Sequence, residues 1–333
     1  MRILKLLLLC LLQLSCTGQE NEKINGVSFV ASREPVTETQ VAQIVKVHAN
    51  HAAVMPFGFI RDIHSPEIVF DSERQWFGET SKGASQYIGE LQKKGVKVMV
   101  KPQIWIWRGE FTGTLKMQSE KDWKTLETSY EAFILAYAKV AQKMKVDLFC
   151  IGTELQQFVT HRPAYWTALI KKIRAVYKGK LTYAANWDEY PKTPFWEELD
   201  FIGIDAYFPL SDARNPTMEQ LREGWKPWKT KIAALAESKG KPVLFTEFGY
   251  RSMDFTGKKP WLVDAHDMQV NLQAQADATQ VIFETFWPED WFAGGYIWKW
   301  FIKHENAGGA EDNRFTPQNK PTQQVLSEFY KKY

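Results

Sequence analysis

The chain has 333 residues, 44% hydrophobic and 24% charged, with 20 glycines and 15 prolines, and these values exclude a disordered or a fibrous protein. Its formal charge of +3 falls to +1, 40 basic against 39 acidic residues, once Arg2 and Lys5 are set aside. Such a body lacks the concentrated basic face that nucleic acid binding requires. The 14 Trp are more than a hydrophobic core usually contains.

The N-terminal segment has the pattern of an export signal. Its apolar run, 6–12, is too short for the roughly 20 residues that span a bilayer. A small residue directly before Cys16 resembles the site at which bacterial lipoprotein signals are cut and the new N-terminal cysteine is acylated. Gln13 departs from the aliphatic residue usual at that place. We predict a signal peptide over 1–15, lipidation at Cys16 and a tether over 16–23; a plain secretory signal is the alternative.

This prediction implies an exported bacterial lipoprotein, periplasmic or at the cell surface, that touches the membrane only through its anchor. The cysteines agree with it, because Cys10 lies in the signal, Cys16 is the lipid site, and Cys150 remains alone in an apolar run. Neither a disulfide framework nor a thiolate metal site can be built from these residues.

Residues 24–333 alternate apolar runs typical of strands with amphipathic stretches of helical period. The predicted strands are 24–30, 52–60, 96–106, 148–155, 180–187, 201–209, 242–250 and 292–300. The clearest predicted helices are 37–49, 81–94, 119–145, 164–178, 218–239 and 268–286. Several strands are almost continuously apolar, as parallel strands buried on both faces are. Eight strand–helix repeats favour an α/β fold of one domain, a (β/α)8 barrel, over a doubly wound sheet.

Two predicted strands end in a glutamate. Active sites of such barrels lie at the carboxyl ends of the strands, and there Glu154 ends the fourth strand and Glu247 the seventh. Each Glu could cap a helix or pair with a cation at the rim. A carboxylate after an apolar run is nevertheless costly unless it is paired, hydrogen-bonded or reacting. Two of them beside Trp-rich loops predict glycoside cleavage, in which one carboxylic acid protonates the leaving oxygen and a second carboxylate attacks the sugar or activates water.

Six motifs together resemble one known family. They are Lys101-Pro102-Gln103-Ile104-Trp105, Gly152-Thr153-Glu154-Leu155, Ala185-Asn186-Trp187, Gly203-Ile204-Asp205-Ala206-Tyr207, Thr246-Glu247-Phe248-Gly249-Tyr250-Arg251-Ser252 and Phe315-Thr316-Pro317-Gln318-Asn319-Lys320-Pro321. As a set they resemble glycoside hydrolase family 113, the β-mannanase-like family, within clan A of retaining (β/α)8-barrel glycosidases. Together with a weaker segment at 49–56, they cover nearly the whole mature chain.

The resemblance implies an endo-β-1,4-mannanase-like enzyme that works by double displacement. Glu154 would be the general acid/base and Glu247 the nucleophile, with Tyr207 hydrogen-bonded to the nucleophile. The wider clan usually has Asn before the acid/base, where this chain has Thr153. The contact to the sugar 2-hydroxyl must then come from elsewhere, and Asn186 is a candidate.

The two roles require different surroundings. A nucleophile must be ionised, so Glu247 should be held by hydrogen-bond donors. The acid must keep its proton, so we expect Glu154 to be the less solvated of the two. Retention requires the two carboxyls to lie about 5–5.5 Å apart, against about 6.5–9.5 Å for inversion, and we predict the shorter separation.

Five of the tryptophans fall at or just past strand ends: Trp105, Trp107, Trp187, Trp298 and Trp300. An indole offers a large flat surface to the apolar face of a sugar ring at low entropic cost. Trp298 resembles the eighth-strand tryptophan that forms the floor of the cleavage subsite in this clan. Ordinary core packing is the alternative for each of them.

Further candidates for sugar contacts, or for support of the glutamates, are Lys101, Gln103, Asn186 and Asp205; Lys101 and Asp205 could equally form an ion pair at the rim. We expect no cofactor and no metal, since the sequence has no ligand pattern, phosphate loop or serine hydrolase motif. The expected partner is a polysaccharide or oligosaccharide, most simply β-mannan, bound by a monomer. Two alternatives remain: a retaining enzyme for another β-glycan (glucan, xylan or a marine polysaccharide), and a non-catalytic glycan-binding lipoprotein.

Overall fold

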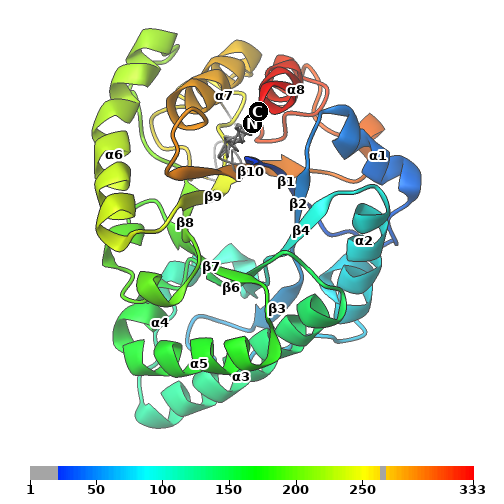
Figure 1. The fold of residues 1–333 in the computed structure, drawn as a ribbon, viewed down its shortest axis with the longest axis vertical. Helices are drawn as coiled ribbons and strands as arrows, with labels where there is room; N and C mark the ends of the chain where they lie inside the picture. Colours follow the sequence, from blue (N-terminus) through cyan, green and yellow to red (C-terminus); the bar gives the residue numbers. More distant parts are fainter. Residues whose placement is uncertain (1–21, 263–267) are drawn as a thin grey trace, which may run out of the picture.

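A computed structural model describes residues 22–262 and 268–333, in which eight parallel strands close a barrel surrounded by helices (Figure 1). The barrel strands, in the order in which they pair, are β1 (Ile24–Phe29), β2 (His51–Val54), β4 (Lys97–Val100), β6 (Leu148–Thr153), β7 (Lys180–Asn186), β8 (Ile202–Ala206), β9 (Val243–Phe248) and β10 (Phe292–Trp300). The helices are α1 (Glu38–Lys46), α2 (Ser81–Lys93), α3 (Glu120–Lys143), α4 (Gln156–His161), α5 (Pro163–Val176), α6 (Met218–Lys239), α7 (Leu272–Phe286) and α8 (Pro321–Lys332). The prediction of a (β/α)8 barrel is confirmed.

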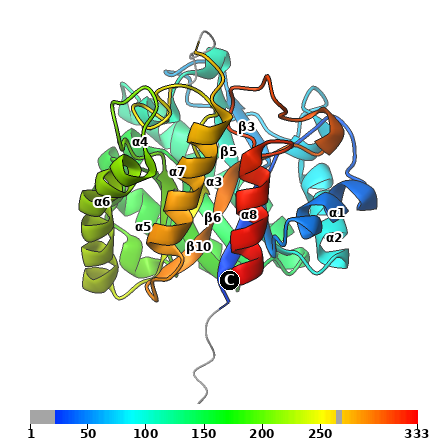
Figure 2. The ribbon, with the colours of Figure 1, turned by 90° about the horizontal axis from the view of Figure 1, so that it is seen from above.

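Two of the predicted strands are each divided in two. The strand expected over 52–60 occurs as β2 and then β3 (Phe57–Ile60), and the next one as β4 and then β5 (Gln103–Ile106). The breaks fall at Pro56 and Pro102, which have no N–H to donate to a ladder. Beyond the prolines β3 and β5 pair again, as a separate two-stranded sheet at the carboxyl end of the barrel (Figure 2).

Local sequence explains several helix ends. Thr37 and Thr217 begin α1 and α6 with capping boxes, and Ser119 caps α3. The α6 helix ends at Gly240 in the left-handed region, with φ 58°, where glycine carries no steric penalty. The short helix α4, directly after β6, was not predicted.

The barrel interior is filled by side chains from alternate strand positions. An inner cluster, separate from the larger one between strands and helices, consists of Ala53, Met99, Leu148, Cys150, Ala184, Phe201, Leu244 and Tyr296. Because strand side chains alternate between faces, the residue two places beyond an inner one points into the next layer toward the carboxyl end. Lys101 stands in this relation to Met99.

The expected signal peptide 1–15, the lipidation site Cys16 and most of the tether 16–23 lie outside the described residues. Within the part of the chain that the structure describes, no helix is both long enough and apolar enough to cross a membrane.

The pairing of β1 with β10 closes the barrel, and hydrogen bonds join β1 to the last two helices outside it. The Asn25 side chain accepts a hydrogen bond from Trp287 Nε1 at 2.8 Å and donates one to the Tyr330 carbonyl at 3.2 Å. Tyr330 OH in turn donates to the Gly26 carbonyl at 2.6 Å. The Asn25 side chain is buried, so these bonds have no water to replace them.

We therefore expect Asn25→Ala to lower the free energy of unfolding by about 2–4 kcal/mol, because it leaves a buried donor and a buried acceptor without partners. Urea denaturation followed by tryptophan fluorescence measures the loss. Asn306→Ala, at an exposed position, is the control and should change stability little. A loss below about 0.5 kcal/mol for Asn25→Ala would contradict this account.

Candidate active site

One lysine and one aspartate occupy the layer above the inner cluster. Lys101 and Asp205 are both 0% exposed, and Lys101 Nζ lies 3.3 Å from Asp205 Oδ2. Thr246 Oγ1 donates to Asp205 Oδ1 at 2.7 Å. The pairing of β8 with β9 slips here by one residue, so that Asp205 lies opposite Glu247. Bulges of this kind re-aim side chains next to functional sites.

The charges of this buried layer depend on one another. Burial disfavours the Lys101 ammonium, but the Asp205 and Glu247 carboxylates outweigh that cost and raise the pKa of Lys101 above its ordinary value. Burial and the Glu247 charge raise the pKa of Asp205 to about 7, against the opposing effect of Lys101. Neither side chain lines the cleft. Of the two alternatives for Lys101 and Asp205, the structure favours the ion pair, which lies inside the barrel and not at its rim.

Glu247 is held by donors from three other strands or strand ends. Lys101 Nζ and Gln103 Nε2 both donate to Glu247 Oε1, the latter at 3.1 Å, and Tyr207 OH donates to Oε2 at 2.6 Å. The Glu247 side chain is 7% exposed. Hydrogen bonds to a carboxylate stabilise its charged form. The expected bond from Tyr207 is present, and Glu247 has the surroundings of an ionised group that faces the cleft.

Glu154 lies in the opposite electrostatic setting. Within residues 22–262 and 268–333 its carboxyl makes no hydrogen bond or ion pair, although it lines the same cleft as Glu247. Burial, followed by the negative charges of Asp205 and Glu247, raises the pKa of Glu154 well above its ordinary value. Both effects favour the protonated form of the Glu154 carboxyl.

One expectation about this pair is wrong. Glu154 is half-buried and Glu247 is buried, so Glu154 is not the less solvated of the two. What separates them is the set of partners: three donors hold Glu247, whereas no donor in the described part of the chain contacts the Glu154 carboxyl and the nearby carboxylates outweigh the effect of Lys101. Solvation alone was a poor guide because it omits the hydrogen bonds that compensate a buried charge.

Both glutamates lie in one open cleft with a volume of about 1890 Å³. It is lined by these predicted sugar contacts: Gln103, Trp105, Asn186, Trp187, Tyr207 and Trp298. Trp107 lines it as well. The volume exceeds the roughly 300–1,000 Å³ of a typical small-molecule pocket, which leaves room for several sugar units.

The prediction for Trp300 is wrong. Its side chain is 0% exposed and stacks on the His304 ring at 5.5 Å, and it does not line the cleft. His304 belongs to the turn that follows β10 and covers the end of this strand. Core packing, the alternative for each tryptophan, applies to this one.

Sequence reasoning missed Lys299, a half-buried cleft residue between Trp298 and Trp300. Its Nζ lies 5.2 Å from the ring centroids of both Trp298 and Phe301. Burial lowers the pKa of Lys299, against the opposing effect of Glu247. A lysine flanked by two tryptophans at a strand end was the available signal.

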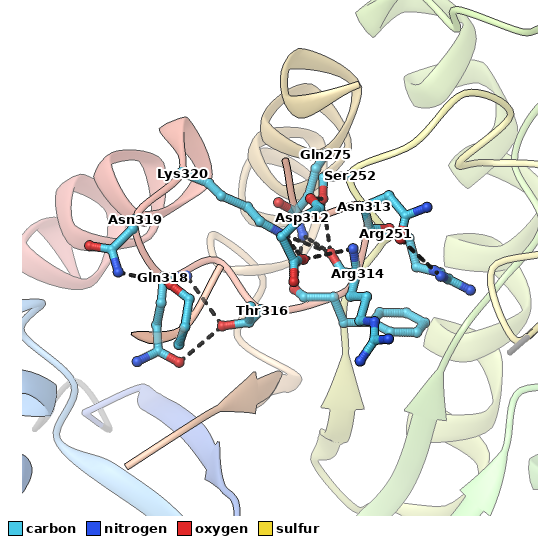
Figure 3. Close-up of polar contacts among 12 residues, drawn as sticks. Arg251, Ser252, Gln275, Asp312, Asn313, Arg314, Thr316, Gln318, Asn319 and Lys320 are labelled. Carbon is cyan, nitrogen blue, oxygen red and sulfur yellow. Dashed lines mark hydrogen bonds and ion pairs between the residues drawn. The ribbon is translucent and has the colours of Figure 1, made fainter. Parts of the chain in front are cut away.

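Sequence reasoning also assigned no role to Phe315, which forms part of the cleft wall. Figure 3 shows how its loop is fixed: Lys320 Nζ donates to Ser252 Oγ at 2.8 Å, to Asp312 Oδ1 at 2.7 Å and to the Arg314 carbonyl at 2.9 Å. Held in this way, the Phe315 ring packs edge-on against Tyr207 at 5.7 Å. This contact gives the motif 315–321 a structural reason.

Comparisons with known proteins agree with this geometry. The model of Glycoside Hydrolase Family 113 matches residues 30–320, while a search of curated proteins found no match. Among solved structures, the family 113 β-mannanase AaManA from Alicyclobacillus acidocaldarius is similar at a TM-score of 0.81 and 23% identity, over 93% of this chain and 97% of that one.

Two further structures share the fold. A family 113 β-1,4-mannanase is similar at a TM-score of 0.81 and 23% identity, over 94% of this chain and 100% of the other. A β-glucuronidase from Faecalibacterium prausnitzii reaches 0.64 at 15% identity, over 93% of this chain and 49% of the other. At these low sequence identities the structural similarity supports only the barrel fold, whereas family membership rests on the match of the family model to residues 30–320. The chain belongs to glycoside hydrolase family 113 and is a glycoside hydrolase.

Proposed function

We propose that the protein is a retaining endo-β-1,4-mannanase in which Glu247 is the nucleophile and Glu154 the general acid/base. The observation that carries the proposal is the contrast between the two carboxyls in one cleft. Three donors stabilise the carboxylate form of Glu247, whereas burial and neighbouring negative charge raise the pKa of Glu154 and favour its protonated form. Family membership and the β-mannanases among the similar structures support mannan as the substrate.

The reaction follows from these protonation states. Glu247 attacks the anomeric carbon and forms the C1–Oε bond, while Glu154 gives its proton to the glycosidic oxygen and the C1–O bond to the leaving sugar breaks. Glu154, now a carboxylate, then takes a proton from water as the water oxygen attacks C1 and releases Glu247. Two inversions give net retention, with the carboxyls at the predicted separation of about 5–5.5 Å.

Replacing either glutamate should remove turnover of mannohexaose. We expect Glu247→Ala and Glu154→Ala to lower kcat by at least roughly 10²–10⁴-fold, the usual contribution of a positioned acid or base. Azide should rescue Glu247→Ala and give an α-mannosyl azide, the inverted product. An unchanged rate in either variant would remove the assignment.

In the wild type kcat/KM should fall as the pH rises through the pKa of Glu154, because the acid loses its proton. With an activated aryl substrate, Glu154→Ala should no longer show this fall at high pH.

A panel of β-glycans separates this proposal from its alternatives. Release of reducing sugar from glucan, xylan or a marine polysaccharide, and none from mannan, would keep the mechanism and change the substrate. Binding of mannan without any release would indicate a glycan-binding lipoprotein. Mannan cleaved internally, with a rapid fall in viscosity, is the outcome expected of an endo-acting enzyme.

The sheet of β3 and β5 supports binding of a long chain. All four residues of β5 line the cleft, but only Gln103 and Trp105, which share one face of the strand, are partly exposed, whereas Ile104 and Ile106 are buried. This face therefore begins at Gln103, which contacts Glu247, and continues to the Trp105 indole. Trp105 lies two residues along the strand, or about 6.6 Å at about 3.3 Å per residue. Trp105 is 47% exposed. Other exposed cleft aromatics are Trp76, Trp107 and Phe111. Exposed apolar surface of this extent is typical of a ligand site.

We expect Trp105→Ala to raise KM for mannohexaose roughly 10-fold, equivalent to about 1.4 kcal/mol, because one sugar ring loses its stacking surface. Hydrolysis of a short aryl β-mannobioside should change much less, since it does not extend over this wall. Val45→Ala, an exposed apolar residue outside the cleft, is the control. An equal rise in KM for the long and the short substrate would show that Trp105 binds no sugar unit remote from the cleaved bond.

We also propose that the enzyme is an exported lipoprotein acylated at Cys16. Support comes from the sequence of the N-terminal segment: a basic start, a short apolar run and a small residue before the cysteine.

In a bacterial host, the wild type should take up labelled palmitate and sediment with membranes, and Cys16→Ser should do neither. Cys10→Ser lies in the segment that is cut off, so it is a control that should leave labelling intact. A soluble, unlabelled wild-type protein would indicate a plain secretory signal.

A further inference from the structure

Glu189 is a buried carboxyl for which the proposed reaction has no role. It follows β7 and is 2% exposed. Tyr183 OH donates to Glu189 Oε1 at 2.7 Å, and the Asn186 backbone N–H donates to Oε2 at 3.1 Å. Burial raises the pKa of Glu189 to about 7, against these two hydrogen bonds. The carboxyl does not line the cleft.

Tyr183 connects this carboxyl to the strand end that carries Glu154. Its hydroxyl accepts a hydrogen bond from the Leu155 backbone N–H at 2.7 Å while it donates to Glu189. The preceding N–H, that of Glu154, donates to the Ala184 carbonyl at 2.8 Å. The backbone on both sides of the Glu154 Cα is therefore fixed from β7.

Glu154 needs such fixing because its backbone is unfavourable. Its φ is 50°, in the left-handed region, which costs a residue with a Cβ about 1 kcal/mol or more. A conformation of this kind persists only where its surroundings hold it. The hydrogen bond from Leu155 N–H reaches Tyr183 only while the hydroxyl proton points away, and Glu189 is the acceptor that directs it there.

We propose that Tyr183 and Glu189 are positioning residues for acid catalysis: they hold the backbone of Glu154 so that its carboxyl reaches the glycosidic oxygen. The inference rests on the proposed role of Glu154. It assigns the pair a task in the proton transfers of Glu154, to the leaving oxygen and later from water, and none in attack by Glu247 or in sugar binding; leaving-group dependence isolates the first of these transfers.

Leaving-group dependence tests this assignment. Phenyl β-mannobioside needs protonation of its leaving oxygen, whereas 2,4-dinitrophenyl β-mannobioside does not, and kcat/KM reports the step in which this bond breaks. We expect Tyr183→Phe and Glu189→Gln to lower kcat/KM for the phenyl substrate roughly 10- to 100-fold and for the dinitrophenyl substrate less than about 3-fold. The loss should appear in kcat, with KM nearly unchanged.

Tyr177→Phe is the matched control. It also removes a buried tyrosine hydroxyl bonded at 2.8 Å, to the Val146 carbonyl, but outside the cleft. Equal losses with both substrates in Tyr183→Phe, or no loss with the phenyl substrate, would overturn the inference. If Glu189→Gln does not fold, as judged by circular dichroism, Tyr183→Phe carries the test alone.

The Glu154→Ala variant distinguishes failure of the positioning role from failure of the proposed mechanism. If Glu154→Ala lowers kcat/KM for the phenyl substrate much more than for the dinitrophenyl substrate, and Tyr183→Phe does not, the positioning role fails and the mechanism stands. If Glu154→Ala shows no such selectivity, the proposed acid is wrong and the mechanism fails first.

Discussion

The site depends on one buried ammonium that serves two carboxylates. Lys101 contacts both Asp205 and Glu247; Lys101 and Asp205 are fully buried, and Glu247 is exposed only toward the cleft. Removal of one member of a buried ion pair is strongly destabilising because it leaves an uncompensated charge, so the arrangement allows little variation. One cation against two anions also leaves the layer negative when both are ionised. Burial, and after it this excess of negative charge, raises the pKa of Glu154. Burial, charge and the donors to Glu247 together distinguish two chemically identical side chains.

The barrel places these groups through strand periodicity and one irregularity. Lys101 reaches the interior because it lies two residues beyond Met99, which packs in the inner cluster. Glu247 would lie out of phase with Asp205 in a regular ladder, but the slip between β8 and β9 brings them opposite each other. The regular ladder therefore buries Lys101 and Asp205, and the bulge adds Glu247, the proposed nucleophile, next to them.

Much of the arrangement could be predicted, because strand ends of a barrel converge. Eight apolar runs were enough to predict that Glu154 and Glu247 face one centre, because each follows a run of apolar residues. The bond of Tyr207 to Glu247 needed the family resemblance. Three-dimensional contacts decided the rest. Trp300 is covered by a turn that follows its strand, and Glu189 has its partners on β7 and in its own turn. The sequence pattern does not show these contacts. The spacing of Lys101, two residues after the inward-pointing Met99, could nevertheless have predicted that it lies inside the barrel and not at the rim.

The strand breaks at the two prolines bring the contacts to Glu247 and the exposed Trp105 onto one continuous segment of backbone. Pro56 and Pro102 interrupt the ladder, yet β3 and β5 continue the paths of β2 and β4. Lys101 precedes Pro102 and Gln103 follows it, and both donate to Glu247 Oε1. The next partly exposed residue on the same strand is Trp105. Glu247, the proposed nucleophile, and Trp105 are thus positioned by one short segment of backbone, and a sugar stacked on Trp105 would be held in fixed register to Glu247. A loop in place of β5 could carry the same side chains, but the distance between anchoring and bond cleavage would then vary.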